Sequence, residues 1–339
     1  MIDLIKVKDL VILIAICAFL AYADVEINQR MGLPGLADGQ RYFDSIINGK
    51  SALAFMQPLV STMPEWAFVF SMTFTIYFAF GLVFLSSKDW LMTLLALLGF
   101  SVTLLAGMNI YAQGMLMVAM LIFWKSKPKT DISSCSLNFP YELAHSLTNT
   151  VLPWALFGIA CLLLHQYGSI LFLVVLGSIL LSKFSDGRLD INLGKFKYLA
   201  YAGFLAVLAT GYFGIMQGTN RLTLFYPTIL PGDFGLLNTF IWLTTLELPL
   251  FITFIKSTDE NMKREVILVA LIFFAACANF VWHSQLEVDF FRILAIGDLI
   301  MLYAIAEARA RKPNEWNASI PLVLLLFGIE RIVLGMRLL

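Results

Sequence analysis

Long apolar blocks separated by short polar stretches run along the whole chain. Each block holds roughly 16 to 25 residues, which as a helix is long enough to cross the roughly 30 Å hydrocarbon layer of a membrane. Strands of a membrane barrel would instead be segments of about ten residues that alternate apolar and polar positions. The pattern therefore predicts an all-α protein with about eleven transmembrane helices. The predicted spans cover residues 9–24, 66–85, 90–107, 109–124, 139–164, 168–183, 197–216, 235–255, 265–283, 290–308 and 317–338.

The polar stretches carry no internal repeat and no separate soluble segment. We therefore expect residues 1–339 to form a single transmembrane domain. The first block lacks a small-residue cleavage site and is followed by further blocks, so it predicts an uncleaved first helix rather than a signal peptide. The span 139–164 contains Pro140 and Pro153, which is typical of a broken or re-entrant helix.

Lysine and arginine residues fall mostly on one side of the predicted helices. Loops on the cytoplasmic side of a membrane hold these residues preferentially. With a cytoplasmic N-terminus, 16 of the 23 basic residues fall on the cytoplasmic side. This orientation places the C-terminus outside, together with the loops 24–65, 217–235 and 283–291. These three outer loops are the predicted location of the functional site.

The composition agrees with a lipid environment. Apolar residues make up 60% of the chain and charged residues 14%, against about 25% charged residues in an average soluble domain. The net charge is zero, so no overall field indicates nucleic acid as a partner. The four cysteines lack the paired spacing of a metal site or a disulfide framework. The sequence also lacks nucleotide-binding glycine loops and the H-E-x-x-H and G-x-S-x-G motifs, so no cofactor is expected.

The loop 24–65 is the longest predicted outer loop and contains a short predicted helix. Asp38 is a good N-cap, and the residues GQRYFDSIING after it have helical spacing up to a glycine. Residues three or four apart share a helix face. One face then holds Asp38, Arg41, Tyr42 and Ser45. The face toward the membrane interface is expected to hold Phe43, Ile46 and Ile47. The polar face is either a solvated interfacial surface with an Arg and Asp pair, or half of a polar substrate site.

Arginines on the outer side, which is poor in positive charge, indicate an anionic partner. A guanidinium offers five donors in a rigid fork that suits phosphate oxygens. Arg30, Arg221 and Arg292 lie on this side, and we interpret them as a shared anion site. His283 and Glu287 precede Arg292 closely and add an imidazole and a carboxylate. Alternatively, Arg292 pairs with a neighbouring acid and only anchors the end of its helix.

Ionisable residues within the predicted spans are candidates for function, because charge is costly there and often functional. His145 is interpreted either as a site residue or as a packed histidine that hydrogen-bonds another helix. Glu247 and Asp298 are expected to be buried acids that pair with arginines or line a cavity.

Several segments together carry a family pattern. An arginine, a glycine turn, an aspartate and a tyrosine follow one another as Arg30, Gly35, Asp38 and Tyr42. A glutamine turn, a lysine cluster and a histidine-containing helix follow as NIYAQGMLMVAML, WKSKPK and ELAHSLTNTVLPW, with Gln113 and His145. An arginine then enters a long helix at Arg292, in DFFRILAIGDLIMLY. In layout and in these residues, the chain resembles the Wzy/EpsG-like polysaccharide polymerases of bacterial inner membranes. One departure is Ala112, which stands where the family commonly has an arginine.

The resemblance implies a multi-pass glycosyltransferase of the bacterial inner membrane that joins lipid-linked glycan repeat units at the periplasmic face. Such a polymerase makes exopolysaccharide, capsule or O-antigen. Its substrate is an oligosaccharide on a polyprenyl diphosphate, its other partners are membrane lipids and a chain-length regulator, and no metal is implied. Asp38 is the expected general base, with His283 and Glu287 as alternates. The implied substrate-binding residues are Arg30, Tyr42, Gln113, His145, Arg221 and Arg292.

Two other classes stay open at this point. A membrane glycosyltransferase that uses a polyprenyl-phosphate sugar often carries paired acids in its first outer loop and a soluble domain, and this sequence has neither. A non-catalytic transporter or flippase of a lipid-linked glycan often shows inverted repeats, and no repeat is visible.

Overall fold

The computed structural model shows that the chain is all-α, as the apolar pattern predicts. It describes residues 6–31, 38–50, 53–87, 89–99, 111–126, 152–164, 168–184, 193–216, 247–282 and 287–312. Every element in these ranges is a helix or a helical turn, and none of these residues forms a strand. The elements are α1 (Val7–Met31), α2 (Asp38–Ile47), η2 (Ala54–Met56), α3 (Gln57–Val60), α4 (Glu65–Leu85), α5 (Trp90–Leu94), η3 (Leu95–Gly99), α7 (Tyr111–Ser126), α9 (Leu152–Leu164), α10 (Gly168–Phe184), α11 (Leu193–Met216), α13 (Leu248–Ser257), η10 (Glu260–Met262), α14 (Lys263–Trp282) and α15 (Glu287–Arg311).

The described helices follow the apolar blocks closely. Each predicted span up to residue 308 contains a described helix, and the last span, 317–338, lies outside the described residues. The first helix is longer than its predicted span 9–24, because α1 continues to Met31. No glycine or proline interrupts the chain between these positions. The Tyr22 hydroxyl also donates to Glu26 Oε1 one helical turn further on, at 2.9 Å. Polar helix formers thus carry α1 beyond its apolar block.

Two stretches of the described helices are long and apolar enough to span a membrane. They are Glu65–Leu85, which is α4, and Glu260–Val281, which includes α14. A helix of this length and composition also occurs in the core of soluble proteins. Shorter apolar helices in the same part of the chain cover Gly114–Lys125, Leu152–Leu163, Gly168–Ser182 and Leu248–Ser257. The all-α architecture is therefore confirmed, and the number of membrane spans stays a prediction.

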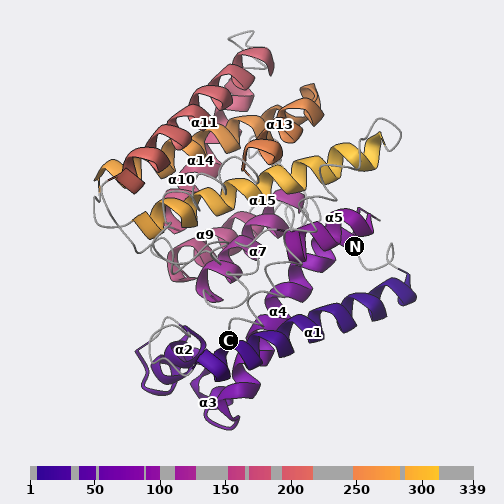
Figure 1. The fold of residues 1–339 in the computed structure, drawn as a ribbon, viewed down its shortest axis with the longest axis vertical. Coiled ribbons are helices and arrows are strands. Elements are labelled where there is room, and N and C mark those ends of the chain that lie inside the picture. The colour runs from indigo at the N-terminus through magenta and orange to yellow at the C-terminus, as the bar shows by residue number, and fades with distance from the viewer. Residues whose placement is uncertain are drawn as a thin grey trace, which may run out of the picture.

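The helices form two groups that α7 connects. In the larger group α10, α11 and α15 pack against α14, and α13 packs against α15. In the smaller group α1 and α2 pack against α4. α7 packs against α4, α9 and α15, and so it joins the two groups. Figure 1 shows the smaller group in indigo and purple below the larger group.

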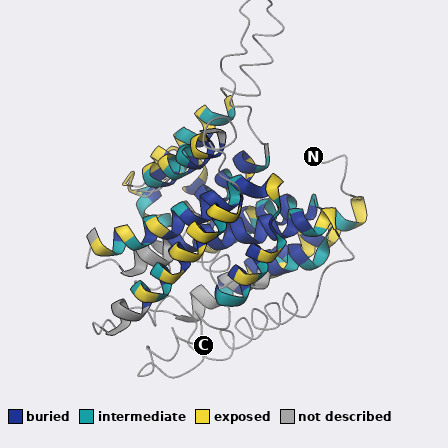
Figure 2. Cartoon of the chain, turned by 90° about the horizontal axis from the view of Figure 1, so that it is seen from above, coloured by how far each residue is buried: buried dark blue, intermediate teal, exposed yellow. Residues whose placement is uncertain are grey.

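The interior is apolar and continuous between the groups. Residues 266–270 of α14 are fully buried. Aromatic rings stack between helices, with ring centroids 4.3 Å apart for Phe204 and Phe251 and 4.5 Å apart for Phe123 and Phe157. Figure 2 shows buried residues on the inward faces of the helices and exposed residues on the outward faces. Each helix therefore has one side committed to packing against its neighbours.

Small residues allow two pairs of helices to approach closely. A Cβ atom on Gly203 of α11 would lie 3.2 Å from Phe273 Cβ and 3.4 Å from the Ala270 carbonyl oxygen of α14. A Cβ atom on Gly81 of α4 would meet the side chain of Leu13 of α1. Glycine at a helix interface is typical of helices that pack without a hydrophobic driving force, because it brings the backbones into contact.

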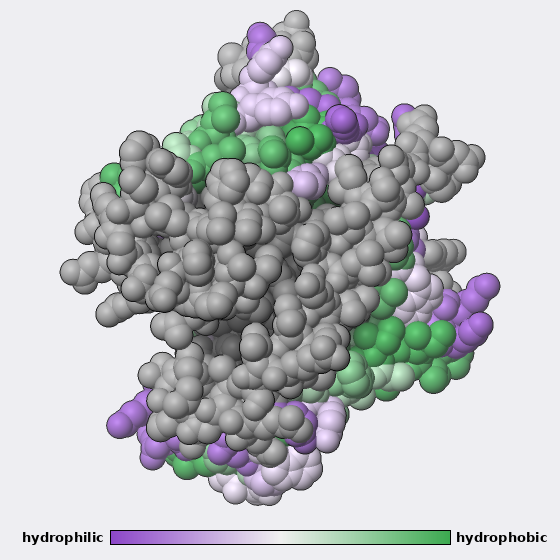
Figure 3. Space-filling model, viewed as in Figure 1, coloured by the Kyte–Doolittle hydropathy of each residue, from purple (hydrophilic) through white to green (hydrophobic). Residues whose placement is uncertain are grey.

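The outward faces of several helices carry large apolar side chains. Val11 on α1 is 59% exposed, Leu162 on α9 is 73% exposed and Leu205 on α11 is 64% exposed. Figure 3 shows apolar side chains of the described residues on the visible surface, with hydrophilic ones gathered toward the extremities. Monomeric soluble proteins rarely expose large contiguous apolar patches. Exposed apolar faces of this kind are typical of a contact with a membrane or with another protein.

Polar contacts tie several helix ends together at one end of the molecule, which we call the charged end. An indole N–H donates to a carboxylate twice: Trp90 Nε1 to Asp9 Oδ1 at 3.0 Å, and Trp124 Nε1 to Glu265 Oε1 at 3.1 Å. Ion pairs at this end include Arg309 with Asp89, and Arg311 with Asp259 at 3.2 Å. All these residues lie in or beside the segments predicted to face the cytoplasm. The structure thus brings these helix ends together, and the side of a membrane that they face stays a prediction.

Lysines close the ends of two helices at the charged end. Lys197 Nζ donates to the carbonyl oxygens of Ile255 and Thr258, at 2.9 Å and 3.0 Å, where α13 ends. Lys125 Nζ donates to the Val83 carbonyl oxygen near the end of α4, at 3.0 Å. The last carbonyls of a helix lack intrahelical partners and carry partial negative charge, so an ammonium group is favourable there.

Candidate functional site

The helix α2 begins at Asp38, as the sequence predicts, and ends in a glycine motif. Gly49 has a φ of 68°, and the Lys50 amide donates to the Ser45 carbonyl oxygen at 2.8 Å. The Gly49 amide donates to the Ile46 carbonyl oxygen at 3.0 Å. This pairing is a Schellman end, which favours glycine because the left-handed conformation penalises a Cβ atom. The start and end of the helix are therefore encoded locally.

The apolar face of α2 packs on protein, which corrects the prediction that it faces the membrane interface. Ile46 is fully buried, and Phe43 and Ile47 pack against the same core. The Phe43 ring lies 5.7 Å from the Phe68 ring of α4, measured between centroids. The physical reason is that α4 offers aromatic surface beside α2, against which this face packs. α2 is therefore fixed in position against α4.

Two acids lie near each other, Asp44 on α2 and Glu65 on α4. The exposed Asp44 carboxylate acts electrostatically on the Glu65 carboxylate, which stands at the first residue of α4. The dipole of α4 favours negative charge at this N-terminus. Tyr42 is half-buried and packs against the apolar core, so its ring is held by its neighbours.

The predicted site residues fall on helix ends or outside the described residues. The structure describes the backbone at Asp38 in α2, Arg30 near the end of α1, Gln113 at the start of α7, and Glu287 and Arg292 at the start of α15. His145, Arg221 and His283 lie outside the described residues. The predicted outer loop 217–235 also lies outside them.

Helix lengths put several of these positions at the end of the molecule opposite the charged end. α1 and α15 both have one terminus at the charged end, at Asp9 and Arg309. With a rise of 1.5 Å per residue, Arg30 and Glu287 lie about 30 Å from that end. α2 packs against α4, whereas α15 packs against α13, α14 and α7. Asp38 and Glu287 therefore stand on helices that pack against different neighbours.

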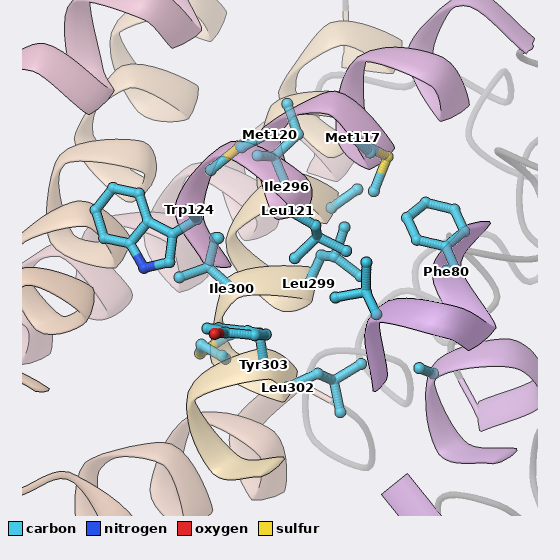
Figure 4. Close-up of a cluster of buried hydrophobic side chains, with 14 of the residues drawn as sticks. Phe80, Met117, Met120, Leu121, Trp124, Ile296, Leu299, Ile300, Leu302 and Tyr303 are labelled. Atoms are coloured by element: carbon cyan, nitrogen blue, oxygen red, sulfur yellow. The ribbon is translucent and has the colours of Figure 1, made fainter. Parts of the chain in front are cut away.

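The second half of α15 also lies in an apolar cluster with side chains of α4 and α7. Figure 4 shows Phe80 of α4, Met117 and Leu121 of α7, and Leu299 and Tyr303 of α15 gathered in one apolar cluster. In the last turn of α15, Arg309 pairs with Asp89. The Asp89 carboxylate also caps α5 by accepting from the Met92 amide at 3.2 Å. The helix that carries Glu287 and Arg292 is thus anchored in its second half.

Glu247 and Asp298 are the two fully buried acids of the described residues. Glu247 is 0% exposed and Asp298 is 1% exposed, which confirms the predicted burial. The two carboxyl groups interact with each other across the contact between α13 and α15. None of their four oxygens makes a hydrogen bond of standard geometry with another described residue. The predicted pairing with arginines is therefore not observed in the described part of the chain.

The number of residues between each acid and the charged end explains why the two acids lie side by side. Glu247 precedes Ser257 by ten residues and Asp298 precedes Arg309 by eleven, and both of those residues lie at the charged end. Both acids therefore lie about 15 Å from that end, at the same depth. Equal distance from the charged end is the sequence signal that would have paired these two acids, which the hydropathy pattern indicates only one at a time.

Comparison of the chain with protein-family models, with curated proteins and with solved structures finds no match. Function must therefore be argued from the residues and the geometry.

Proposed function

We propose that the chain is a multi-pass membrane protein that joins glycan repeat units carried on a polyprenyl diphosphate. The proposed location is the inner membrane of a bacterium, and the proposed site faces the periplasm. The observation that carries the proposal is α2, a short helix that begins at Asp38 and is fixed against α4. A base must be held in position to abstract a proton efficiently, and a packed helix provides that support.

The exposed apolar faces and the charged end support the membrane part of the proposal. Lipid is a suitable cover for the outward faces of α1, α9 and α11, whose large apolar side chains are exposed. Basic residues gather at the charged end, which is the distribution expected of a cytoplasmic face. About eleven spans with a cytoplasmic N-terminus fit this arrangement.

The proposed reaction needs a base and an anion site. The acceptor hydroxyl oxygen attacks the anomeric carbon of the donor sugar, and the carbon–oxygen bond to the diphosphate breaks. The electron pair of that bond leaves with the diphosphate, and the hydroxyl proton passes to Asp38. His283 and Glu287 are the alternate bases. The groups proposed to stabilise the leaving diphosphate are Arg30, Arg221 and Arg292.

Three further residues are proposed to contact the glycan. Tyr42 stands one turn after Asp38 on α2, so it shares the face of the proposed base. Gln113 and His145 are added on the strength of the resemblance. An aromatic ring and neutral hydrogen-bonding groups are suited to sugar hydroxyls.

Replacing Asp38 with asparagine tests the proposal directly. The Asp38→Asn variant keeps the size of the side chain and removes its basic lone pair. Polymer formation should fall by about 10² to 10⁴, the usual share of general base catalysis. The matched control is Asp44→Asn, an exposed acid on the same helix, which should leave polymer formation unchanged. Polymer would be measured on gels of surface polysaccharide and with purified protein in vesicles that contain the lipid-linked unit.

Two results would contradict the proposal at different levels. Normal polymer from Asp38→Asn would show that Asp38 only caps α2, and the role of base would pass to His283 or Glu287. Purified wild-type protein that forms no polymer from a lipid-linked repeat unit would overturn the assignment as a polymerase.

A transporter or flippase of a lipid-linked glycan is the second candidate. The buried pair Glu247 and Asp298 favours it, because acids inside a helical membrane protein are typical of ion-coupled transport. Cells that lack the protein separate the two candidates. Lipid-linked units should accumulate on the periplasmic side without a polymerase, and on the cytoplasmic side without a flippase. A lectin added to spheroplasts would detect only periplasmic units.

A further inference from the structure

The contact between α13 and α15 holds two carboxyl groups where charge is poorly tolerated. All four oxygens of Glu247 and Asp298 are inaccessible to solvent and lack a hydrogen-bond partner of standard geometry among the described residues. An ionised carboxylate in such surroundings is costly unless it is paired. Two ionised carboxylates side by side are more costly still, because like charges repel. A ligand with positive charge between them removes both costs.

No other charged group of the described chain compensates for these acids. Among the described residues, no charged group other than the partner carboxyl acts on either acid. Beside them α13 contributes the buried apolar side chains Leu250 and Phe251, and α14 lies against neighbouring Gly297 with Ile272 and Phe273.

The next titratable groups along these helices belong to a separate cluster. The Tyr303 hydroxyl donates to Glu307 Oε1 at 3.0 Å, and Glu265 of α14 acts on the same tyrosine. Glu265 is held by Trp124 at the charged end. These groups lie toward that end and do not act on the buried pair.

We propose that Glu247 and Asp298 form a proton-binding site in the middle of the helical bundle, which holds one exchangeable proton between the two carboxyl groups and controls the packing of α13 on α15. Binding converts one carboxylate to a carboxylic acid, whose hydroxyl then donates to the remaining carboxylate. Loss of the proton leaves two carboxylates that repel each other across the interface. This inference depends only on the described helices and is independent of the proposed polymerase activity.

The backbone at Glu247 makes this end of α13 the part most able to respond. Glu247 itself lies in a π-helical turn, and Pro249 in the first turn has no amide hydrogen to donate. Fewer helical hydrogen bonds must therefore break when repulsion moves the start of α13. The opposite end is fixed, because Lys197 binds the last carbonyl groups.

Labelling with dicyclohexylcarbodiimide tests the proton site on the full-length protein in lipid vesicles. This apolar reagent reacts with protonated carboxylic acids inside membranes, and the acid proton transfers to the carbodiimide nitrogen as the carboxylate adds to its carbon. We expect label on Glu247 or Asp298, located by mass spectrometry of peptides. The labelled fraction should fall by roughly tenfold per pH unit once the pH exceeds the midpoint of titration. Sodium and potassium ions should have no effect on it.

Variants separate this site from other acids. The double variant Glu247→Gln with Asp298→Asn keeps the shapes of both side chains and should lose the label. Glu307→Gln on the same helix, α15, should keep it. Hydrogen exchange supplies a second readout on the same protein, because loss of the proton should speed exchange in α13 by roughly tenfold beyond the intrinsic effect of pH. In the double variant only the intrinsic effect should remain.

Either of two results would overturn the inference. Absence of label on both acids over the whole pH range at which the protein stays folded would show that both carboxylates are ionised and paired with a cation or a basic side chain. Label that sodium or potassium suppresses at constant pH would identify a monovalent cation, and not a proton, as the ligand.

Discussion

Replacing Lys197 with methionine should destabilise the protein measurably. Lys197 Nζ donates to the carbonyl oxygens of Ile255 and Thr258, at 2.9 Å and 3.0 Å, and so connects the start of α11 to the end of α13. Methionine has a similar length and keeps the apolar stem, but it cannot donate. Both carbonyls would lose their charged partner, and the end of α13 would lose a favourable charge.

The expected loss in the free energy of unfolding follows from the number of these hydrogen bonds and from their exposure to water. A hydrogen bond to a charged group contributes about 1.5–3 kcal/mol. Lys197 is half-buried, so water replaces part of each bond and the total is about 2 kcal/mol. On the scale of soluble domains this lowers the melting temperature by about 5 °C.

Buried cysteines provide the assay for this prediction. Cys17 and Cys161 are fully buried, so a thiol-reactive dye reports their exposure as the detergent-solubilised protein unfolds on heating. Lys256→Met is the matched control, because Lys256 is exposed in the last turn of the same helix, α13. It should shift the melting temperature by about 1 °C or less. Equal shifts for Lys197→Met and Lys256→Met would refute the capping role.

A cysteine that replaces Lys50 should react with a label added from the periplasm, and a cysteine that replaces Lys127 should not. The opposite labelling pattern would contradict the proposed topology. Arg292→Lys keeps the charge but loses the bidentate fork, so polymer should fall at least tenfold at normal expression, and unchanged polymer would remove Arg292 from the anion site. Gly203→Val should cost about 1–3 kcal/mol of stability by dye assay, because its Cβ would press on Phe273 and on the α14 backbone. Gly177→Val is its control, since only a flexible leucine end lies within 4 Å there, and equal losses would refute the close packing.

The helices themselves were predictable from local sequence. Continuous apolar blocks identified the positions of α4, α10 and α14, and Asp38 marked the start of α2. Boundaries that depend on polar residues were not predictable in the same way. α1 extends to Met31 because nothing in its polar tail breaks a helix, and hydropathy does not register that.

Tertiary packing determines two features that the hydrophobic periodicity of the sequence could not predict. The apolar face of α2 was recognised, but an amphipathic helix pattern does not say whether lipid or protein covers that face. The contact of Phe43 with Phe68 resolves it in favour of protein. In the same way, Glu247 and Asp298 were recognised as buried, but their partner depends on which helices lie side by side. The contact between α13 and α15 supplies that partner.

One helix connects the three regions on which the proposals depend. α15 begins with Glu287 and Arg292 in the proposed site, carries Asp298 at its middle, and ends with Arg309 in the ion pair with Asp89. The ion pair and the apolar cluster around Tyr303 fix its second half. Repulsion caused by loss of the proton at Asp298 can therefore be relieved in two ways. Either the start of α13 moves, or the first half of α15 moves. If α15 moves, proton occupancy of the buried pair will change the position of Arg292, and polymer formation will depend on the same titration as the carbodiimide label.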